Sequence, residues 1–320
     1  MKRLVAVLAL AACATPAPIL RNEEPAAGQD PIVDMSGFSY FWRCDLRRSG
    51  AISCQSLFDL VPPAEVVELA GSCLRTSHGT VECTNSVDPF REIVEARGAT
   101  RIASAYGESC AIRRDGGIAC WATGGAASTY NVPRIRGAID IAIDGRACAV
   151  LLDGRVWCWH HRDLPAPVPG ISSAVAIALA AGTTCVRQHD GRVACWGDNA
   201  YGQLGDGSTE RRVQPRLVPG LDHVRQIVMY AQSVCALRDD GSVWCWGGRA
   251  FSQHAERPRP RLCLRPTQVA VLGYADRIWM TLDTLCALGP EGRRICLSDS
   301  SSEAALYGVE SSRHWLDGCR

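Results

Sequence analysis

The sequence has almost no lysine and no real excess of either charge. Lys2 is the only lysine among 320 residues, and 34 basic residues stand against 33 acidic ones, a formal net charge of +1. Nucleic-acid-binding domains carry a clustered basic excess, so this balance gives no electrostatic footprint for nucleic acid. Hydrophobic residues at 47% and charged residues at 21% exclude a largely disordered chain. We therefore expect a folded protein that does not bind nucleic acid.

The sequence also lacks the short motifs of common catalytic sites. It contains no Gly-x-Ser-x-Gly elbow, no His-Glu-x-x-His pair, no Gly-x4-Gly-Lys phosphate loop and no Gly-x-Gly-x-x-Gly after a strand. A repeat protein can assemble a site from several units, so missing motifs do not by themselves exclude an enzyme. We predict no catalytic residue, no cofactor and no bound metal.

The N-terminal apolar run is too short to be a permanent membrane span. Lys2 and Arg3 precede the run Leu4–Leu10, which is the pattern of an export signal, whereas a spanning helix needs about 20 apolar residues. Leu10-Ala11-Ala12-Cys13 resembles the lipobox of bacterial lipoproteins, in which cleavage precedes the cysteine and its sulfur takes a diacylglycerol. That resemblance implies a signal peptide over 1–12 and lipid attachment at Cys13. The alternative is a plain secretory signal with Cys13 incidental.

The residues after Cys13 predict a tether and a place in the cell. Residues 13–35 are rich in Pro, Ala, Glu and Asp without apolar periodicity, which indicates a lipidated, flexible linker. Ala14 is not the aspartate that retains some lipoproteins at the inner membrane, so the outer membrane is favoured. We predict a lipid-anchored protein of the cell envelope that touches the membrane through its anchor only, with residues 36–320 as the folded domain.

The sequence is rich in cysteine, with 17 residues. In an exported protein, cysteines first indicate disulfides. Seven pairs share a spacing of ten residues, whereas zinc ligands are usually separated by only two to four residues. The predicted disulfide cysteines are Cys44 and Cys54, Cys73 and Cys83, Cys110 and Cys120, Cys148 and Cys158, Cys185 and Cys195, Cys235 and Cys245, and Cys286 and Cys296, with Cys263 and Cys319 left over. Whether Cys263 and Cys319 pair with each other stays open.

Each ten-residue spacing predicts a β-hairpin. A glycine lies four residues before every second cysteine, and apolar alternation flanks it. Counting inward from Cys110 and Cys120 leaves Arg114-Asp115-Gly116 as a three-residue loop, whose last position takes positive φ and favours glycine. The cysteines then form a non-hydrogen-bonded pair with Cα atoms about 4.5 Å apart, a separation that a disulfide can span.

The hairpins recur with the period of propeller blades. Successive first cysteines are separated by 29, 37, 38, 37, 50 and 51 residues. Trp157 and Trp159 alternate with Cys158 along the third strand of a unit, so they lie on the opposite face and can pack against the next blade. The position after the second cysteine is tryptophan again at Trp121, Trp196 and Trp246. Such a stripe could line a ligand groove, but its recurrence at one repeat position favours a core between blades.

One stretch carries a family resemblance. Residues Cys185–Gly207 read CVRQHDGRVACWGDNAYGQLGDG, which resembles the repeat of the regulator-of-chromosome-condensation propeller family in its bacterial, exported, cysteine-paired form. The resemblance is specific over 183–247, good over 108–160 and weak elsewhere. It implies a seven-bladed β-propeller, and the seven cysteine pairs indicate the same count. We therefore predict an all-β chain forming a seven-bladed β-propeller with a disulfide inside each blade.

Two long insertions, 197–216 and 247–266, are the candidate recognition loops, because loops on a rigid scaffold are where binding usually occurs. Asp198 and Asp206 in the first loosely suggest a calcium loop, although Asp and Gly also supply turn geometry. The second insertion carries a basic set with Glu256 as the only opposing charge. Its candidate contact residues are Arg249, Arg257, Arg259, Arg261 and Arg265. They form either a solvated loop or a contact for an acidic envelope partner.

These features together favour a monomeric, non-catalytic scaffold that binds an unidentified protein partner in the envelope through propeller loops. The alternative is an inhibitor of a secreted or periplasmic enzyme. Guanine-nucleotide exchange, which the family performs in its eukaryotic branch, is disfavoured by export to a compartment without nucleotide.

Overall fold

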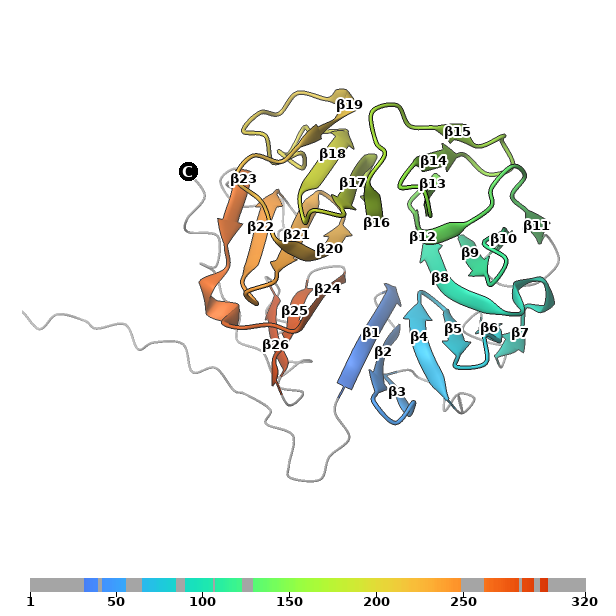
Figure 1. Cartoon of the computed structure of the whole chain (residues 1–320). Coiled ribbons are helices and arrows are strands. Elements are labelled where there is room, and N and C mark those ends of the chain that lie inside the picture. The colour runs from blue at the N-terminus through green and yellow to red at the C-terminus, as the bar shows by residue number, and fades with distance from the viewer. Residues whose placement is uncertain are drawn as a thin grey trace, which may run out of the picture.

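A computed structural model describes residues 32–39, 42–55, 65–84, 90–105, 107–122, 129–248, 262–281, 284–290 and 294–298, with side chains left out at 32–45, 53–55, 281 and 298. Small antiparallel sheets surround a common centre, so the predicted all-β propeller is confirmed (Figure 1). Within these ranges no helix is long and apolar enough to span a membrane. The predicted signal peptide and Cys13 lie outside the described residues. A strand already begins at Ile32, inside the predicted tether.

The described strands form seven sheets, five with four strands and two with three, each in consecutive chain order. The first two sheets contain β1 (Ile32–Ser39), β2 (Trp42–Arg47) and β3 (Ile52–Gln55), then β4 (Val66–Ala70), β5 (Cys73–Thr76), β6 (Val81–Cys83) and β7 (Arg91–Glu92). The next two contain β8 (Ala99–Ala105), β9 (Glu108–Arg113), β10 (Ile118–Ala122) and β11 (Tyr130–Asn131), then β12 (Ala138–Ile143), β13 (Ala147–Leu151), β14 (Val156–Trp159) and β15 (Ala166–Pro167). The last three contain β16 (Ala174–Ala180), β17 (Thr183–Gln188), β18 (Val193–Gly197) and β19 (Arg212–Leu217), then β20 (Val224–Tyr230), β21 (Ser233–Arg238), β22 (Val243–Gly247) and β23 (Cys263–Gln268), and finally β24 (Arg277–Thr281), β25 (Thr284–Leu288) and β26 (Arg294–Ser298). Short 3-10 turns η1 (Val94–Ala96) and η3 (Ala270–Leu272) precede β8 and β24.

Six of these sheets carry the predicted disulfide between their second and third strands. The bonded cysteines face each other in register, with Cα atoms 4.0 to 4.2 Å apart. The bonds are Cys73–Cys83, Cys110–Cys120, Cys148–Cys158, Cys185–Cys195, Cys235–Cys245 and Cys286–Cys296. The described residues thus show six disulfide-stapled blades, one fewer than the seven predicted.

The sheet β1–β3 lies where the remaining predicted unit belongs. Its backbone places Cys44 opposite Cys54, but the side chains of both cysteines lie outside the described residues, so this disulfide stays a prediction. Leu46 is buried against Val66 and Leu74 of the following sheet. Strand β1 contacts both β4 and β24, so this sheet lies between the first and last disulfide-stapled blades (Figure 1).

The cysteine hairpins have the predicted geometry and a second role that the sequence did not indicate. Gly116 has φ 71°, and its carbonyl accepts a hydrogen bond of 3.1 Å from the N–H of Ala138, which opens the next blade. The N–H of Arg114 donates to the carbonyl of Gly98, 3.0 Å away, in the preceding link. The first of these bonds recurs between Gly79 and Ala99, Gly154 and Ala174, Gly191 and Val224, and Gly241 and Ala275. These five hairpins therefore fasten their blades to the next ones.

The tryptophans form the core between blades, but the predicted direction of packing is wrong. Trp246 is buried with Leu204 and Val218 of the preceding blade, and Trp159 is buried with the Cys110–Cys120 pair of the preceding blade. Alternation correctly separates tryptophan from cysteine on the third strand. Which neighbour each face meets depends on the handedness of the ring, which the alternation does not encode.

A chain of polar contacts crosses the innermost strands. Arg101 on β8 lies 3.7 Å from Glu68 on β4 and forms a close ion pair with Asp140 on β12. The other carboxylate oxygen of Asp140 accepts a hydrogen bond of 2.9 Å from the N–H of Ile177 on β16. Burial raises the pKa of Asp140, although Arg101 and the backbone donors favour its charged form. Four neighbouring blades are joined in this way.

Candidate interaction surfaces

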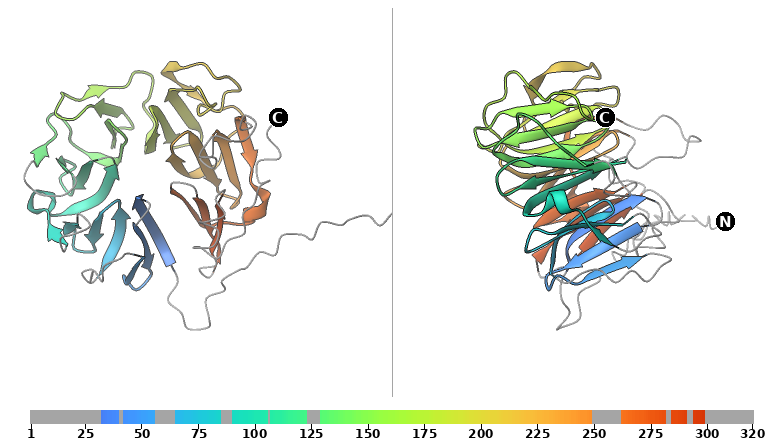
Figure 2. Two further views of the ribbon diagram at one scale, coloured as in Figure 1. Left: turned by 180° about the vertical axis from the view of Figure 1, so that it is seen from behind. Right: turned by 90° about the vertical axis from the view of Figure 1, so that its right-hand side faces the viewer.

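The strand order gives the propeller two different faces. At one end of each blade lie the turn between its first two strands and the connection between its last two; we call this end the loop face. At the other end lie the cysteine hairpin and the link to the next blade; we call this end the hairpin face. Figure 2 shows the blades from a second side and edge-on. The predicted insertions 197–216 and 247–266 connect β18 to β19 and β22 to β23, so both belong to the loop face.

The connection between β18 and β19 is held from within by Asn199. This side chain is 1% exposed. Its amide nitrogen donates to the carbonyl oxygens of Ser208 and Glu210, each 3.0 Å away, and its oxygen accepts a hydrogen bond of 2.9 Å from the N–H of Leu204. One buried side-chain amide therefore fixes the backbone at three points of this long connection. Without these hydrogen bonds, a loop of this length would sample many conformations.

The same connection is fastened to the next blade through Gln203. Its side-chain oxygen accepts a hydrogen bond of 2.8 Å from the N–H of Tyr201. Its backbone carbonyl accepts one of 2.8 Å from Nε1 of Trp246, which belongs to the following blade. The loop face is thus rigid here because the loop and the blade core share a hydrogen bond.

The two aspartates of this connection serve the turn. Asp206 accepts hydrogen bonds from the N–H and hydroxyl of Ser208, at 2.9 and 2.7 Å, and from Arg212 at 3.3 Å. Burial favours the neutral acid, but these donors outweigh it and lower the pKa of Asp206. Asp198 pairs with Arg211 at 3.1 Å. Asp206 therefore caps a turn and Asp198 forms an ion pair, and the described residues contain no cluster of three or more His, Cys, Asp or Glu suited to a metal ion.

Most of the predicted basic loop lies outside the described residues, which hold only the last of its arginines. The undescribed positions are Arg249, Arg257, Arg259 and Arg261. Arg265 is exposed on β23, and its guanidinium lies against Gly207 of the neighbouring connection. Cys263 is disulfide-bonded, while Cys319, the other cysteine outside the ten-residue pairs, lies outside the described residues. The structure therefore brings Arg265 beside the first insertion.

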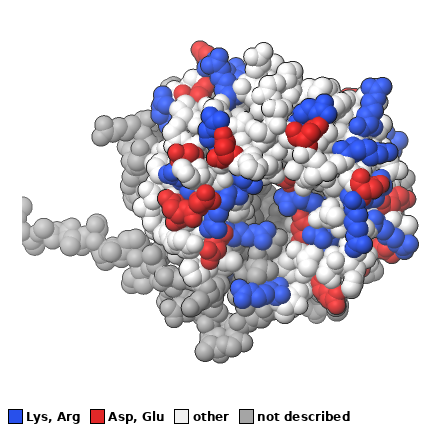
Figure 3. All heavy atoms as spheres, in the orientation of Figure 1, with Lys and Arg blue, Asp and Glu red and all other residues white. Residues whose placement is uncertain are grey.

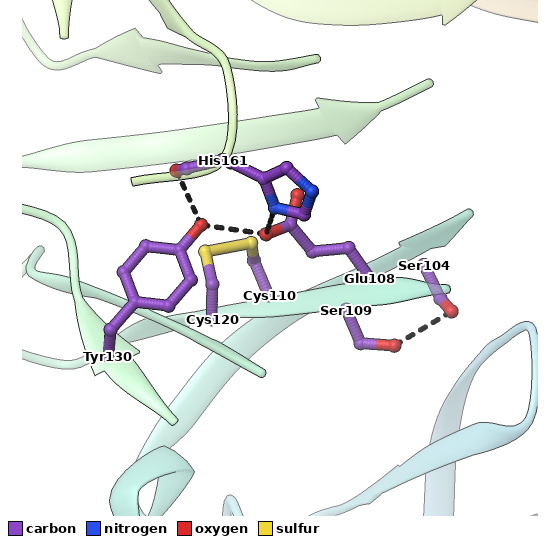
Figure 4. The surroundings of a disulfide bond; sticks show 7 residues. All are labelled: Ser104, Glu108, Ser109, Cys110, Cys120, Tyr130 and His161. Carbon is purple, nitrogen blue, oxygen red and sulfur yellow. Dashed lines mark hydrogen bonds and ion pairs between the residues drawn. A yellow bond between two sulfur atoms is a disulfide. The ribbon is translucent and has the colours of Figure 1, made fainter. Parts of the chain in front are cut away.

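A polar cluster that the sequence did not indicate joins two blades on the loop face (Figure 4). The hydroxyl of Tyr130 lies 2.7 Å from Oε1 of Glu108 and 2.6 Å from the carbonyl oxygen of His161. The His161 ring lies 3.5 Å from the same carboxylate, and Arg162 covers the tyrosine ring. Burial and the Glu108 carboxylate raise the pKa of Tyr130. The phenol therefore stays protonated and acts as a fixed donor between blades.

A second cluster joins the next two blades on this face. Arg146 donates a short hydrogen bond to the buried hydroxyl of Thr184. Burial lowers the pKa of Arg146 and raises that of Asp144, which accepts hydrogen bonds from the N–H groups of Ala181 and Gly182. These groups hold the two neighbouring blades together through hydrogen bonds.

Family models match one part of the chain. The regulator of chromosome condensation (RCC1) repeat matches residues 190–237, and a second model of the same repeat matches residues 224–253. These matches include the insertion 197–216 and the Trp246 that anchors it. No curated protein is similar enough in sequence to match the chain.

Solved structures show the same fold at low sequence identity. Yeast RCC1 (Prp20) bound to Kap60 has a TM-score of 0.65 and 13% identity over 93% of this chain and 86% of its own. Prp20p from Saccharomyces cerevisiae has a TM-score of 0.61 and 14% identity over 75% and 72%. Human WBSCR16 has a TM-score of 0.62 and 13% identity over 76% and 79%. The chain is a disulfide-stapled β-propeller. Its repeat matches and these neighbours support a propeller of the RCC1 type.

Proposed function

We propose that this protein is a non-catalytic scaffold that binds a protein partner through its loop face. The observation that carries the proposal is the connection between β18 and β19, which Asn199 and Trp246 hold in one conformation. That rigid connection presents Glu210 and Arg211, with side chains 78% and 68% exposed. A pre-organised loop loses little conformational entropy on association, which favours binding.

The similar structures support a protein as the partner. The study of Prp20p describes its binding to Gsp1p and histones, and a second structure of the yeast protein contains Kap60. At 13 to 14% identity these likenesses show the fold alone. They do not carry those partners to this chain. They agree with the proposal that this propeller acts by binding a protein.

We further propose that the chain is a lipid-anchored protein of the cell envelope, with Cys13 as the anchor and β1–β3 as the seventh blade. Six disulfides support export, because such bonds persist in oxidising compartments. The contacts of β1 with β4 and β24 support a closed ring. Closure protects sheet edges that would otherwise pair with other chains.

Site-specific crosslinking in cells tests the loop-face proposal. A photoreactive residue at Glu210 should give one discrete adduct with a partner, and Asn199→Ala should abolish it by releasing the connection. The matched control is a photoreactive residue at Arg192, which is exposed on the hairpin face of the same blade. Absence of any Glu210 adduct, or an equal adduct from Arg192, would refute binding through the loop face.

A further inference from the structure

Arg134 occupies a backbone position that sister blades reserve for glycine. It follows Pro133 and has φ 62°. The corresponding Pro-Gly turns in the next two blades place Gly170 at φ 83° and Gly220 at φ 72°. The residue before each proline makes the same hydrogen bond of 2.8 to 2.9 Å to the third strand of its blade, from Val132, Val168 and Val218. The three turns are therefore equivalent. At the position after the proline, only the first turn has a residue with a side chain, and the other two have glycine.

Stability does not account for the arginine. A β-carbon in the left-handed region costs roughly 1–2 kcal/mol relative to glycine. Arg134 is exposed and makes no hydrogen bond or ion pair with any residue that the structure describes. Strain of this kind is typical of functional positions, where another role opposes the local preference.

Two further exposed arginines belong to the same part of the hairpin face. The bond from Ala138 to Gly116 and the close approach of Gly116 to Gly137 hold the hairpin against the link. This backbone contact places the hairpin that carries Arg114 against the link that carries Arg134 and Arg136, while the Arg114 guanidinium donates a hydrogen bond of 3.5 Å to the carbonyl of His78 in the preceding hairpin. We call these three residues the arginine triad.

The acidic residue beside the triad is already engaged. The N–H of Gly117 donates to the Asp115 carboxylate at 2.9 Å, and Arg113 lies 3.6 Å from it. These groups, with a smaller contribution from Arg136, lower the pKa of Asp115. Asp115 therefore neutralises only part of the triad, and a local positive surface remains. In Figure 3, basic side chains with acidic ones among them lie along the right-hand side, where Figure 1 places β8–β11.

An apolar residue lies next to the triad. Leu152, at the tip of the following hairpin, is 77% exposed, and its N–H donates to the carbonyl of Gly137 at 2.8 Å. Ile139, two residues beyond Gly137, is 38% exposed. Arginine is enriched and lysine depleted at protein-binding surfaces, and the exposed Leu152 and Ile139 add apolar area beside these arginines.

We propose that the arginine triad and Leu152 bind an acidic segment of a partner protein, whose carboxylates pair with the guanidinium groups while an aliphatic side chain contacts Leu152. Arginine forms forked hydrogen bonds with carboxylates, which suits this ligand. Nucleic acid would require a longer basic stripe, and three basic residues give an anionic membrane only about 1 kcal/mol each. This inference goes beyond the loop-face function and uses the opposite face.

Arg134→Gly is the informative variant because it restores the residue found in the sister turns. The test measures fluorescence anisotropy of a labelled twelve-residue peptide built from Glu-Glu-Leu repeats, at low ionic strength. We expect Arg134→Gly to weaken peptide binding at least about fivefold, as for loss of a charge-assisted pair, while its unfolding midpoint in denaturant rises. The control Arg192→Ala removes an arginine of another hairpin that already pairs with Asp190 at 2.7 Å, and it should leave binding unchanged.

Several outcomes would overturn the inference. They are no binding of the peptide to the wild type, equal binding by Arg134→Gly, or an equal loss in Arg192→Ala. Tighter, Arg134-dependent binding of phosphatidylglycerol vesicles or of an oligonucleotide would assign the surface to a membrane or to nucleic acid instead. None of these results bears on crosslinking from Glu210, so the two proposals fail separately.

Discussion

Nε1 of Trp246 donates a hydrogen bond of 2.8 Å to the carbonyl oxygen of Gln203, which lies in the loop of the preceding blade. Trp246 is 1% exposed. This one bond joins the hydrophobic core between two blades to the surface that we propose for binding, so core packing and loop conformation are coupled.

Trp246→Phe should therefore destabilise both core and loop. Loss of the indole donor leaves a buried carbonyl unsatisfied, which costs about 1–3 kcal/mol of unfolding free energy. Hydrogen exchange should rise in residues 198–211. Trp121→Phe removes a similar volume, but Nε1 of Trp121 has no hydrogen-bond partner among the described residues, so its cost should be smaller. Equal losses in the two variants, measured by urea unfolding, would contradict this role.

Gly116→Ala should be much more damaging than Gly220→Ala. The two glycines have nearly the same φ, 71° and 72°, so both variants bear a left-handed penalty of roughly 1–2 kcal/mol. A β-carbon at Gly116 would also overlap the backbone of Gly137, whereas one at Gly220 meets open space. The difference between the unfolding midpoints of the two variants should report the cost of the steric overlap, because the cost of the positive φ is the same in both. Similar midpoints for the two variants would show that the hairpin–link contact is not tight.

Asp140→Asn should change how stability depends on pH. Burial raises the folded-state pKa of Asp140 above 3.8, so the folded state binds more protons between the two values. Wild-type stability therefore falls as pH rises through that window. The unfolding free energy of Asp140→Asn, relative to wild type, should increase as pH rises above 3.8 through this window.

Asp153→Asn should change the pH dependence of stability in the opposite direction. The pKa of Asp153 is lowered by hydrogen bonds from Arg155, so the wild-type carboxylate stabilises the fold above the unfolded pKa and loses this effect in acid. Relative to wild type, Asp153→Asn should be least stable near neutral pH. If Asp140→Asn follows the Asp153→Asn profile, the buried acid is stabilised by Arg101 more than burial opposes it.

Thiol titration of denatured, unreduced mature protein should find at most two free thiols. Twelve cysteines lie in the six described disulfides, and Cys263 is also bonded. In the chain-entropy model, each hairpin disulfide should stabilise the folded state by about 2.5 kcal/mol because it lowers the conformational entropy of the unfolded chain. A count of eight or more free thiols would mean that the bonds do not form in the cell.

Cys13→Ser should release the protein from membranes into the soluble fraction of the envelope. A thioether-linked diacylglycerol supplies the proposed anchoring, and serine cannot accept it. Fractionation and metabolic labelling with a fatty-acid analogue measure both consequences. Continued membrane association of an unlabelled Cys13→Ser variant would exclude the lipid anchor.

The local architecture could be predicted because its signals lie within a dozen residues. Ten-residue cysteine spacing and a glycine four residues before the second cysteine define a hairpin whose register follows from counting. The structure confirms six disulfides and positive φ at six of these glycines, including Gly116 and Gly154. Each blade is thus encoded by contacts that are close in the chain.

The sequence also contains a signal for the strained backbone position of Arg134, but the cysteine spacing does not reveal it. Aligning the units would place Val132-Pro133-Arg134 against Val-Pro-Gly in the next two blades. The outer connection of each unit varies in length, so an alignment on cysteines alone does not bring these turns together. The positive φ of Arg134 shows that this turn is equivalent to the two Pro-Gly turns.

By itself, the sequence determined the hairpins, their disulfides and the alternation of tryptophan and cysteine, because these depend on pleat and turn geometry over short spans. Only the tertiary structure decided which neighbour each face meets, where the Asp140 carboxylate is satisfied and which arginines share a surface. Asp140 and Ile177 are 37 residues apart, and nothing in a period-two pattern specifies the hand of the ring that brings them together. Handedness and closure are properties of the packed blades as a set.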